Sequence, residues 1–275
     1  MEYPASTRDW DWVQFDVEGA SAAIRRTTTR VTGRLRATTQ PSQRAHQLDW
    51  TISETAAHLV VVLRANTGYA QGQTEPVLDL DRLAETNRAR IDELPERDLH
   101  ALADSLEASV EELLLATDDR DAADLVPWHS HTQLPLGGML GIVLAELLLH
   151  GRDIARAQKE RWRIEAADAV HVVRGGIAFG PLVIDRDLAT TRPTTYRVRC
   201  RGVPTSIFRF ADGALTIADD SGQPVDCQLR LDPVTFTLVA FGRRSPIVAA
   251  LQGRALGWGR RPLAAFRLPS YFVPA

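Results

Sequence analysis

Two histidines and one glutamate stand inside strongly apolar segments of the chain. Glu146 and His150 are four residues apart in a run rich in leucine, and His58 stands in a second apolar run at 56–60. Four residues turn an α-helix by about 400°, so Glu146 and His150 would lie on one face, one turn apart. Because an uncompensated buried carboxylate is costly, this pair requires a cation, a hydrogen-bond network or water beside it.

Three donors of the types His, Glu and His from two facing helices would suit a divalent metal such as zinc. They would leave one coordination position open, which is the arrangement of a catalytic site. The alternative is a buried His–Glu hydrogen bond without a metal. Glu54 lies four residues before His58 and could be a fourth ligand. With Thr51 it also has the spacing of a capping box, which is the interpretation we favour.

Other residues that could carry chemistry have weaker patterns. His129 and His131 could act as acid or base beside a metal, but we interpret this H-x-H pair as solvent-exposed. Trp50 and Trp128 precede two expected helices at a place where the mouth of the bundle could lie, and core packing is the interpretation that we favour. The glycine-rich segment 253–259 lacks the strand-then-helix context of a phosphate loop and is interpreted as turns.

The first 160 residues have a helical pattern, with apolar residues three and four positions apart. We expect helices at 12–36, at 51–69, at 78–115 with an interruption at Pro95, and at 136–158. A polar, proline-containing loop is expected at 118–135. Four long helices joined by loops favour a four-helix bundle.

The pattern changes after a further short helix at 166–177. Beyond Pro181, alternating apolar and polar residues predict strands at 195–200, 206–210 and 226–231, and helices are expected at 233–241 and 246–252. The sequence therefore predicts an all-α domain at 1–182 and a small α/β domain at 183–275.

Composition excludes several classes of protein. The chain has 275 residues, of which 44% are apolar and 24% charged, and its net charge of −3 argues against a nucleic-acid partner. Cys200 and Cys227 cannot build a disulfide framework, so a reducing cytoplasm is expected. The longest apolar stretch, 134–149, is shorter than the roughly 20 residues of a membrane span, and the first residues lack a secretory signal. We therefore expect no membrane partner.

Two segments resemble a known family. Residues 50–59, W-T-I-S-E-T-A-A-H-L, resemble the "W-t-v-x-[DE]-x-x-x-H-L" segment of the mycothiol-dependent maleylpyruvate isomerase family, part of the DinB-like metalloenzymes. Residues 146–155, E-L-L-L-H-G-R-D-I-A, resemble that family's "E-x-x-x-H-x-x-D-[IL]-A" helix. The second half is similar to the family's C-terminal α/β domain, which is related to sterol-carrier-like folds. The resemblance implies a DinB-like bundle followed by that domain.

The resemblance also implies roles for particular residues. His58, Glu146 and His150 fall on the family's three zinc ligands. Asp153 matches the family's aspartate and could orient a ligand, or it could be a surface carboxylate paired with a neighbouring arginine. Family members place a functional arginine in the C-terminal domain, and Arg243, after an apolar helix, is our candidate for it. Its alternatives are Arg230 and a merely solvated arginine at a helix end.

The resemblance further implies a divalent metal, zinc in the first place, and mycothiol as the thiol cosubstrate. Coordination to a metal can hold a thiol as a thiolate, which is then a nucleophile toward an electrophilic small molecule. We expect a mycothiol S-transferase or thiol-exchange enzyme. The first alternative is a mycothiol-dependent maleylpyruvate cis–trans isomerase, and an alternative of another class is a non-catalytic module that binds a small ligand.

Overall fold

A computed structural model describes residues 10–74, 82–128 and 132–273 of the chain. These residues form two compact units. The first comprises the described residues of 16–164, and the second comprises residues 165–273 together with 10–15. His129 and His131 lie outside the described residues.

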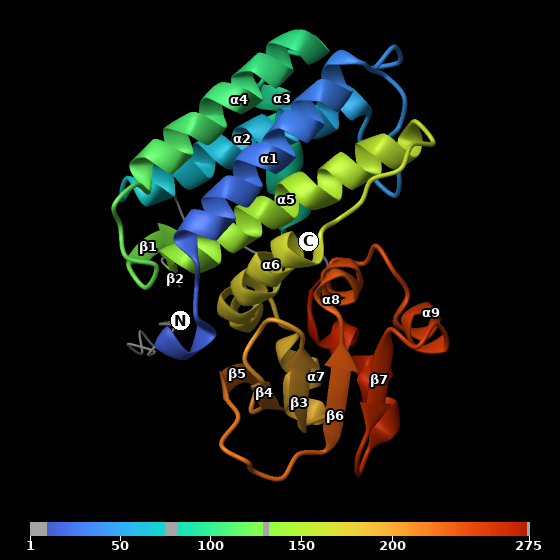
Figure 1. Ribbon diagram of the computed structural model, residues 1–275. Helices are drawn as coiled ribbons and strands as arrows, with labels where there is room; N and C mark the ends of the chain where they lie inside the picture. Colours follow the sequence, from blue (N-terminus) through green and yellow to red (C-terminus); the bar gives the residue numbers. More distant parts are fainter. Residues whose placement is uncertain (1–9, 75–81, 129–131, 274–275) are drawn as a thin grey trace. The chain divides into compact units, whose positions relative to one another are not determined.

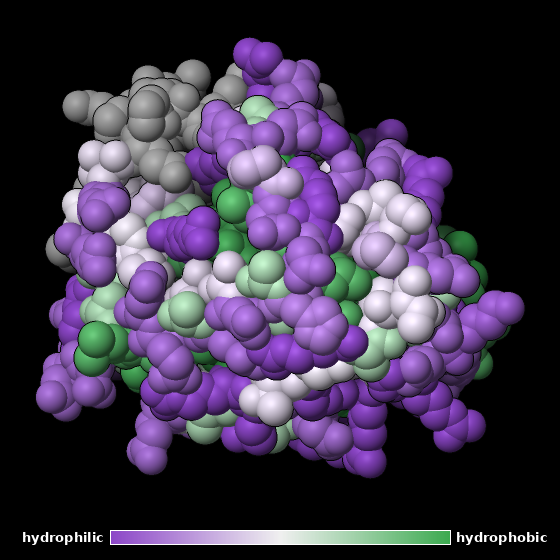
Figure 2. Space-filling view, turned by 90° about the horizontal axis from the view of Figure 1, so that it is seen from above, coloured by the Kyte–Doolittle hydropathy of each residue, from purple (hydrophilic) through white to green (hydrophobic). Residues whose placement is uncertain are grey.

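The first unit is built from long helices, as the sequence predicts (Figure 1). Its helices are α1 (Val17–Arg36), α2 (Ile52–Ala70), α3 (Leu83–Glu93), α4 (Leu99–Ala116) and α5 (Leu136–Ala157). Helix α1 packs against α4 and α5, and α2 packs against the same two helices, which gives the expected four-helix bundle. Hydrophilic residues dominate the face of the molecule in Figure 2, where hydrophobic residues gather in separate areas.

Side-chain caps determine where helices such as α1 and α2 begin. The Asp16 carboxylate accepts a hydrogen bond from the backbone N–H of Gly19 at the start of α1. At the start of α2, the Thr51 hydroxyl accepts from the Glu54 N–H, and the Glu54 carboxylate accepts from the Thr51 N–H. The capping box is therefore confirmed, and it fixes the register of the helix that carries His58.

The segment 118–135 differs from the expected loop. It contains an antiparallel pair of short strands, β1 (Leu125–Trp128) and β2 (Thr132–Pro135). Burial of Val126 and Trp128 shows the alternation of a strand, but two prolines and a run of aspartates hide that alternation in the sequence. Trp128 is a core residue, as expected.

The second unit is an α/β structure around a five-stranded sheet. Its helices are α6 (Ala166–Phe179), α7 (Arg186–Thr191), α8 (Pro233–Ala240) and α9 (Pro246–Leu251), with short 3-10 helices η1 (Asp11–Val13), η3 (Gly180–Leu182) and η4 (Pro262–Tyr271). The strands are β3 (Thr194–Cys200), β4 (Ser206–Ala211), β5 (Ala214–Asp219), β6 (Cys227–Leu231) and β7 (Ala255–Trp258). They lie in the order β5-β4-β3-β6-β7, and only β3 and β6 are parallel.

Two strands of this sheet were not expected. Strand β5 lies between the expected strands at 206–210 and 226–231, and β7 lies in the glycine-rich segment that we interpreted as turns. That interpretation is wrong for 255–258. A Cβ at Gly257 would come within 2.5 Å of the Ala265 Cβ, so glycine lets η4 approach the strand closely. Gly257 therefore interrupts the residue pattern that would predict a strand, and the same glycine permits η4 to pack against β7.

The division between the units also lies elsewhere than the predicted boundary at 182. Helix α6 packs against α8 of the sheet unit, so residues 165–182 join the second unit. This packing partner is far away in sequence, and helical periodicity alone cannot reveal it. Among the described residues, no helix is both long enough and apolar enough to span a bilayer.

Candidate metal centre

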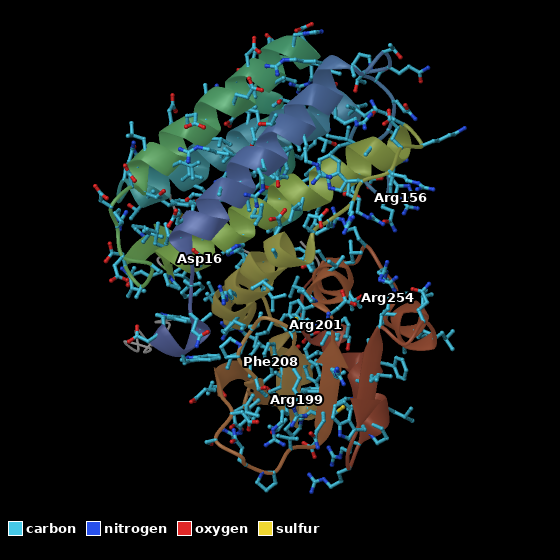
Figure 3. The ribbon with its side chains drawn as sticks, viewed as in Figure 1. Asp16, Arg156, Arg199, Arg201, Phe208 and Arg254 are labelled. Atoms are coloured by element: carbon cyan, nitrogen blue, oxygen red, sulfur yellow. The ribbon has the colours of Figure 1, made fainter. Side chains whose placement is uncertain are left out.

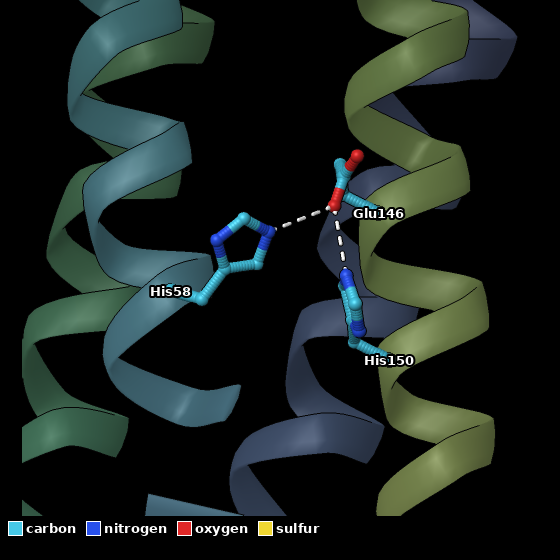
Figure 4. Close-up of side chains that lie close together, drawn as sticks. All are labelled: His58, Glu146 and His150. Carbon is cyan, nitrogen blue, oxygen red and sulfur yellow. Dashed lines mark hydrogen bonds and ion pairs between the residues drawn. The ribbon is translucent and has the colours of Figure 1, made fainter. Parts of the chain in front are cut away.

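Helices α2 and α5 bring His58, Glu146 and His150 together (Figure 4). The Glu146 Oε2 atom lies 3.3 Å from His58 Nε2 and 3.0 Å from His150 Nε2. One donor atom from each of the three residues can be chosen so that all lie within 4.8 Å of one another. Both histidines are buried, and the Glu146 side chain is 25% exposed. The cluster predicted from two separate segments is therefore formed.

Electrostatics favour the charge states of Glu146 and His58 that bind metals. Burial raises the pKa of Glu146, but the hydrogen bonds with His150 and His58 outweigh burial, and the net shift is downward. Burial lowers the pKa of His58, and the contact with Glu146 only partly opposes that effect. An ionised carboxylate beside a neutral imidazole is the ligand form that a divalent cation requires.

The distances from the Glu146 oxygen to the two imidazole nitrogens fit a metal of the size of zinc. Ligands at about 2.0–2.1 Å around a tetrahedral ion lie about 3.3 Å from one another. The two nitrogen–oxygen distances of 3.3 Å and 3.0 Å are close to that separation. Three protein ligands leave the fourth position of a tetrahedral site to water or a substrate atom. The cluster thus has the donor set of a catalytic metal site, with its three donor atoms within 4.8 Å of one another.

Asp153 is buried beside His150 and does not lie at the surface. Its side chain is fully buried, and its Oδ2 lies 3.9 Å from His150 Nδ1. Its Oδ1 also lies 3.5 Å from Arg152 Nη1, so the alternative pairing with this arginine is present as well. His150 Nδ1 is buried and has no hydrogen-bond partner among the described residues. A small movement of Asp153 would supply one, as carboxylates do for metal-bound histidines.

Trp50 lies at the site, which our interpretation as a core residue missed. Its ring centroid is 4.7 Å from that of His58 and 6.1 Å from that of His150. The two imidazoles meet edge to face at 5.0 Å. The available signal was the position of Trp50 in the same short motif as His58, immediately before the capping box.

Glu54 is a capping residue and is absent from the cluster. Its carboxylate bonds to Thr51, and its Oε1 lies 2.7 Å from Arg88 Nη1. The hydrogen bond from Thr51, reinforced by Arg88, lowers the pKa of Glu54 against the effect of burial. The fourth-ligand alternative is therefore not supported.

The candidate arginines belong to the second unit. Arg243 follows α8, is partly buried, and donates from Nη1 to the Phe241 carbonyl over 2.9 Å. Arg230 is exposed on β6.

The fold and the cluster define a class: a helical bundle with a candidate metal centre, joined to an α/β unit. Residues 21–155 match the family model described as the mycothiol maleylpyruvate isomerase N-terminal domain. The helical unit belongs to that family, which confirms the resemblance seen in the sequence.

Solved structures with a similar fold extend the likeness to the second unit. The crystal structure of the mycothiol-dependent maleylpyruvate isomerase superposes with a TM-score of 0.51 at 14% identity, over 84% of this chain and 90% of that one. A histidine-to-alanine mutant of the isomerase gives a TM-score of 0.52 with the same identity and coverage. At this identity the likeness establishes a common fold. No curated protein sequence matches the chain significantly.

Proposed function

We propose that this protein is a metal-dependent enzyme that uses mycothiol for a cis–trans isomerisation of the maleylpyruvate type. The observation that carries the proposal is the cluster of His58, Glu146 and His150 inside a domain of the isomerase family. The shared fold with the isomerase over both units adds support. The comparisons favour this function over the S-transferase that we expected first.

In this proposal His58, Glu146 and His150 hold a divalent ion, for which zinc is the first candidate because imidazole and carboxylate suit it. The bound ion would lower the pKa of a coordinated thiol and keep it as a thiolate at neutral pH. Trp50 packs against both imidazoles and would restrict their orientation. Asp153 would act as a positioning residue for His150.

The reaction then needs no net consumption of thiol. The thiolate sulfur forms a bond to one carbon of the activated cis double bond, and the electron pair of that bond moves onto the adjacent carbonyl system. The former double bond is now single and rotates. Return of the electron pair expels the thiolate and leaves the trans isomer. An S-transferase would instead release the thiol bound to its product.

We also propose Arg243 as a group that binds a carboxylate of the substrate. A guanidinium can bind a carboxylate through two parallel hydrogen bonds, and lysine cannot reproduce that geometry. Arg243→Lys is expected to raise KM for a dicarboxylate substrate and to leave kcat nearly unchanged. An equal fall in kcat with unchanged KM would contradict this role.

The test of function combines metal analysis with turnover. Protein purified without chelator should contain about one zinc per chain, and with mycothiol it should convert maleylpyruvate to fumarylpyruvate while the free thiol concentration stays constant. His150→Ala should lose both metal and turnover. The matched control is His100→Ala, because His100 is an exposed histidine on α4 of the same unit.

Three other outcomes would contradict the proposal. A stable mycothiol conjugate would identify a transferase. Metal-free protein that folds normally and binds an apolar ligand would identify a non-catalytic module. Full turnover by metal-free His150→Ala would remove the metal from the mechanism.

A further inference from the structure

The end of the second unit has a charge quite unlike that of the whole chain. After Asp232 the sequence contains no aspartate or glutamate. The same stretch contains six arginines, at positions 243, 244, 254, 260, 261 and 267. The segment 233–275 is therefore strongly cationic within a chain whose net charge is −3.

The same segment exposes most of the large apolar side chains on the described surface. Nine such side chains are exposed among the described residues, and seven of them lie between positions 247 and 266. They are Ile247, Val248, Leu251, Leu256, Trp258, Leu263 and Phe266. These residues belong to α9, β7 and η4, which contact one another at the edge strand of the sheet. Gly257 faces η4, so Leu256 and Trp258 lie on the other side of β7. Isolated exposed apolar residues are ordinary, whereas a group of this kind marks an interaction surface.

The strand register places arginines beside two of these apolar residues. Leu256 is paired with Arg230 on β6, and Arg230 is paired with Arg199 on β3. Residues paired across strands lie on the same sheet face, and so do Leu256 and Trp258 on β7. The Arg199 guanidinium carbon lies 5.8 Å from the centroid of the Trp258 ring. We call residues 246–267, together with Arg199 and Arg230, the basic–apolar edge.

Several arginines of this edge have no acidic partner within the unit. Arg260 and Arg261 pair with Asp226. In contrast, Arg230, Arg254 and Arg267 form no ion pair with any carboxylate in the part of the chain that the structure describes. Arg199 on β3 and Arg254 beside α9 are labelled in Figure 3. The positive charge of the edge is therefore available to an external partner.

We propose that the basic–apolar edge docks on the surface of an anionic phospholipid membrane. Apolar side chains gain free energy by entering the boundary between headgroups and acyl chains, and arginines beside them gain from anionic headgroups. Tryptophan is suited to that boundary because its ring is apolar and its N–H is polar. A second copy of the edge would bring like charges together, and nucleic acid would offer no apolar environment to five exposed aliphatic side chains.

Docking of this kind needs no membrane span. The expectation of no membrane partner rested on the short apolar stretch at 134–149, which bears only on insertion across a bilayer. Peripheral docking depends instead on the exposed side chains of a folded surface, and these are identified only by the structure. The proposal is independent of the metal centre and of the proposed reaction.

The test measures partition of the full chain onto sucrose-loaded vesicles by sedimentation. Phosphatidylcholine vesicles containing about 30% phosphatidylglycerol should bind the protein, and pure phosphatidylcholine vesicles should bind it far more weakly. Raising the ionic strength from about 0.05 M to about 0.5 M should release much of the bound protein.

Two variants and two matched controls assign the binding to this edge. Leu251→Asp should lower the partition coefficient at least about tenfold, because the Leu251 side chain would otherwise enter the lipid. Arg254→Glu should lower it about tenfold or more, because it reverses one charge at the surface. Leu115→Asp and Arg64→Glu, on exposed positions of α4 and α2, should have little effect. Leu115 is 77% exposed and Leu251 is 84% exposed, so neither change should disturb the fold.

Other results would overturn the proposal. Absence of sedimentation with anionic vesicles excludes the membrane as the partner. Binding that Leu251→Asp and Leu115→Asp weaken equally would place the contact elsewhere. A dimer that dissociates in Leu251→Asp would assign the edge to a second copy, and a mobility shift of an oligonucleotide without vesicle binding would assign it to nucleic acid.

Discussion

Two helical glycines of the bundle provide substitutions with opposite expected effects. An ideal Cβ at Gly151, which follows His150 in α5, would lie 2.5 Å from Trp162 Cζ2 and 2.9 Å from Val31 Cγ2. At Gly33 in α1, no heavy atom of a neighbouring group among the described residues would come within 4 Å of that Cβ. Alanine gains about 0.5–1 kcal/mol of helix propensity over glycine at such positions.

The contacts at Gly151 more than cancel this gain. An ordinary carbon–carbon contact is about 3.5–4.0 Å, so Trp162 or α5 would have to move by about 1 Å. A displaced Trp162 ring would also weaken its contact with the Arg30 guanidinium, which lies 4.1 Å from the ring centroid. Overpacking of a core costs about 1–3 kcal/mol. The net effect of Gly151→Ala is a loss of about 0–2.5 kcal/mol, with a midpoint of about 1 kcal/mol, whereas Gly33→Ala gains about 0.5–1 kcal/mol.

Urea unfolding followed by far-UV circular dichroism measures both changes. The two variants should differ by about 2 kcal/mol in the free energy of unfolding, with the parent protein between them. Gly151→Ala should also weaken zinc binding, since displacement of α5 moves His150, and Gly33→Ala should not. A Gly151→Ala protein that is as stable as the parent would show that Trp162 does not pack tightly against α5.

Three further substitutions test other parts of the first unit. Glu54→Ala should lower the free energy of unfolding by about 0.5–1 kcal/mol through loss of the capping box. The zinc content of this variant should equal that of the parent, and a loss of zinc would instead identify Glu54 as a ligand. Asp153→Asn should weaken zinc binding about 10–100-fold with an unchanged circular dichroism spectrum, and unchanged affinity would contradict its role toward His150. The hydrogen bond from Arg36, together with that from Thr32, lowers the pKa of Glu107 to about 2. The ionised Glu107 carboxylate therefore stabilises the folded protein fully above pH 4.5, and this contribution is lost as the pH falls toward 2. Glu107→Gln should therefore reduce the free energy of unfolding near pH 7 by at most about 1 kcal/mol, since the Arg36–Glu107 ion pair is partly exposed and screened. The variant should also lose less stability than the parent between pH 4.5 and pH 2. Parallel profiles of stability against pH for the two proteins would refute this role of Glu107.

The sequence determined those features that depend on neighbours within a few residues. The helical repeat places Glu146 and His150 on one face of α5, and the Thr51–Glu54 spacing specifies the start of α2. Both are local properties of the sequence. The prediction of a helical bundle and the resemblance to the family rest on such local properties, and both are confirmed. The alternation in β3, β4 and β6 likewise predicted the α/β character of the second unit.

Only the tertiary structure decided which of these local elements meet. Packing of α2 against α5 brings His58 to Glu146, and it also places Trp50 against the imidazoles. Packing of α6 against α8 assigns residues 165–182 to the second unit, and the close approach of η4 explains a strand that contains Gly257. Contacts between residues far apart in the chain depend on the shape and burial of whole surfaces. The residue pattern of one segment shows which of its faces is apolar, but it does not show which other segment packs against that face.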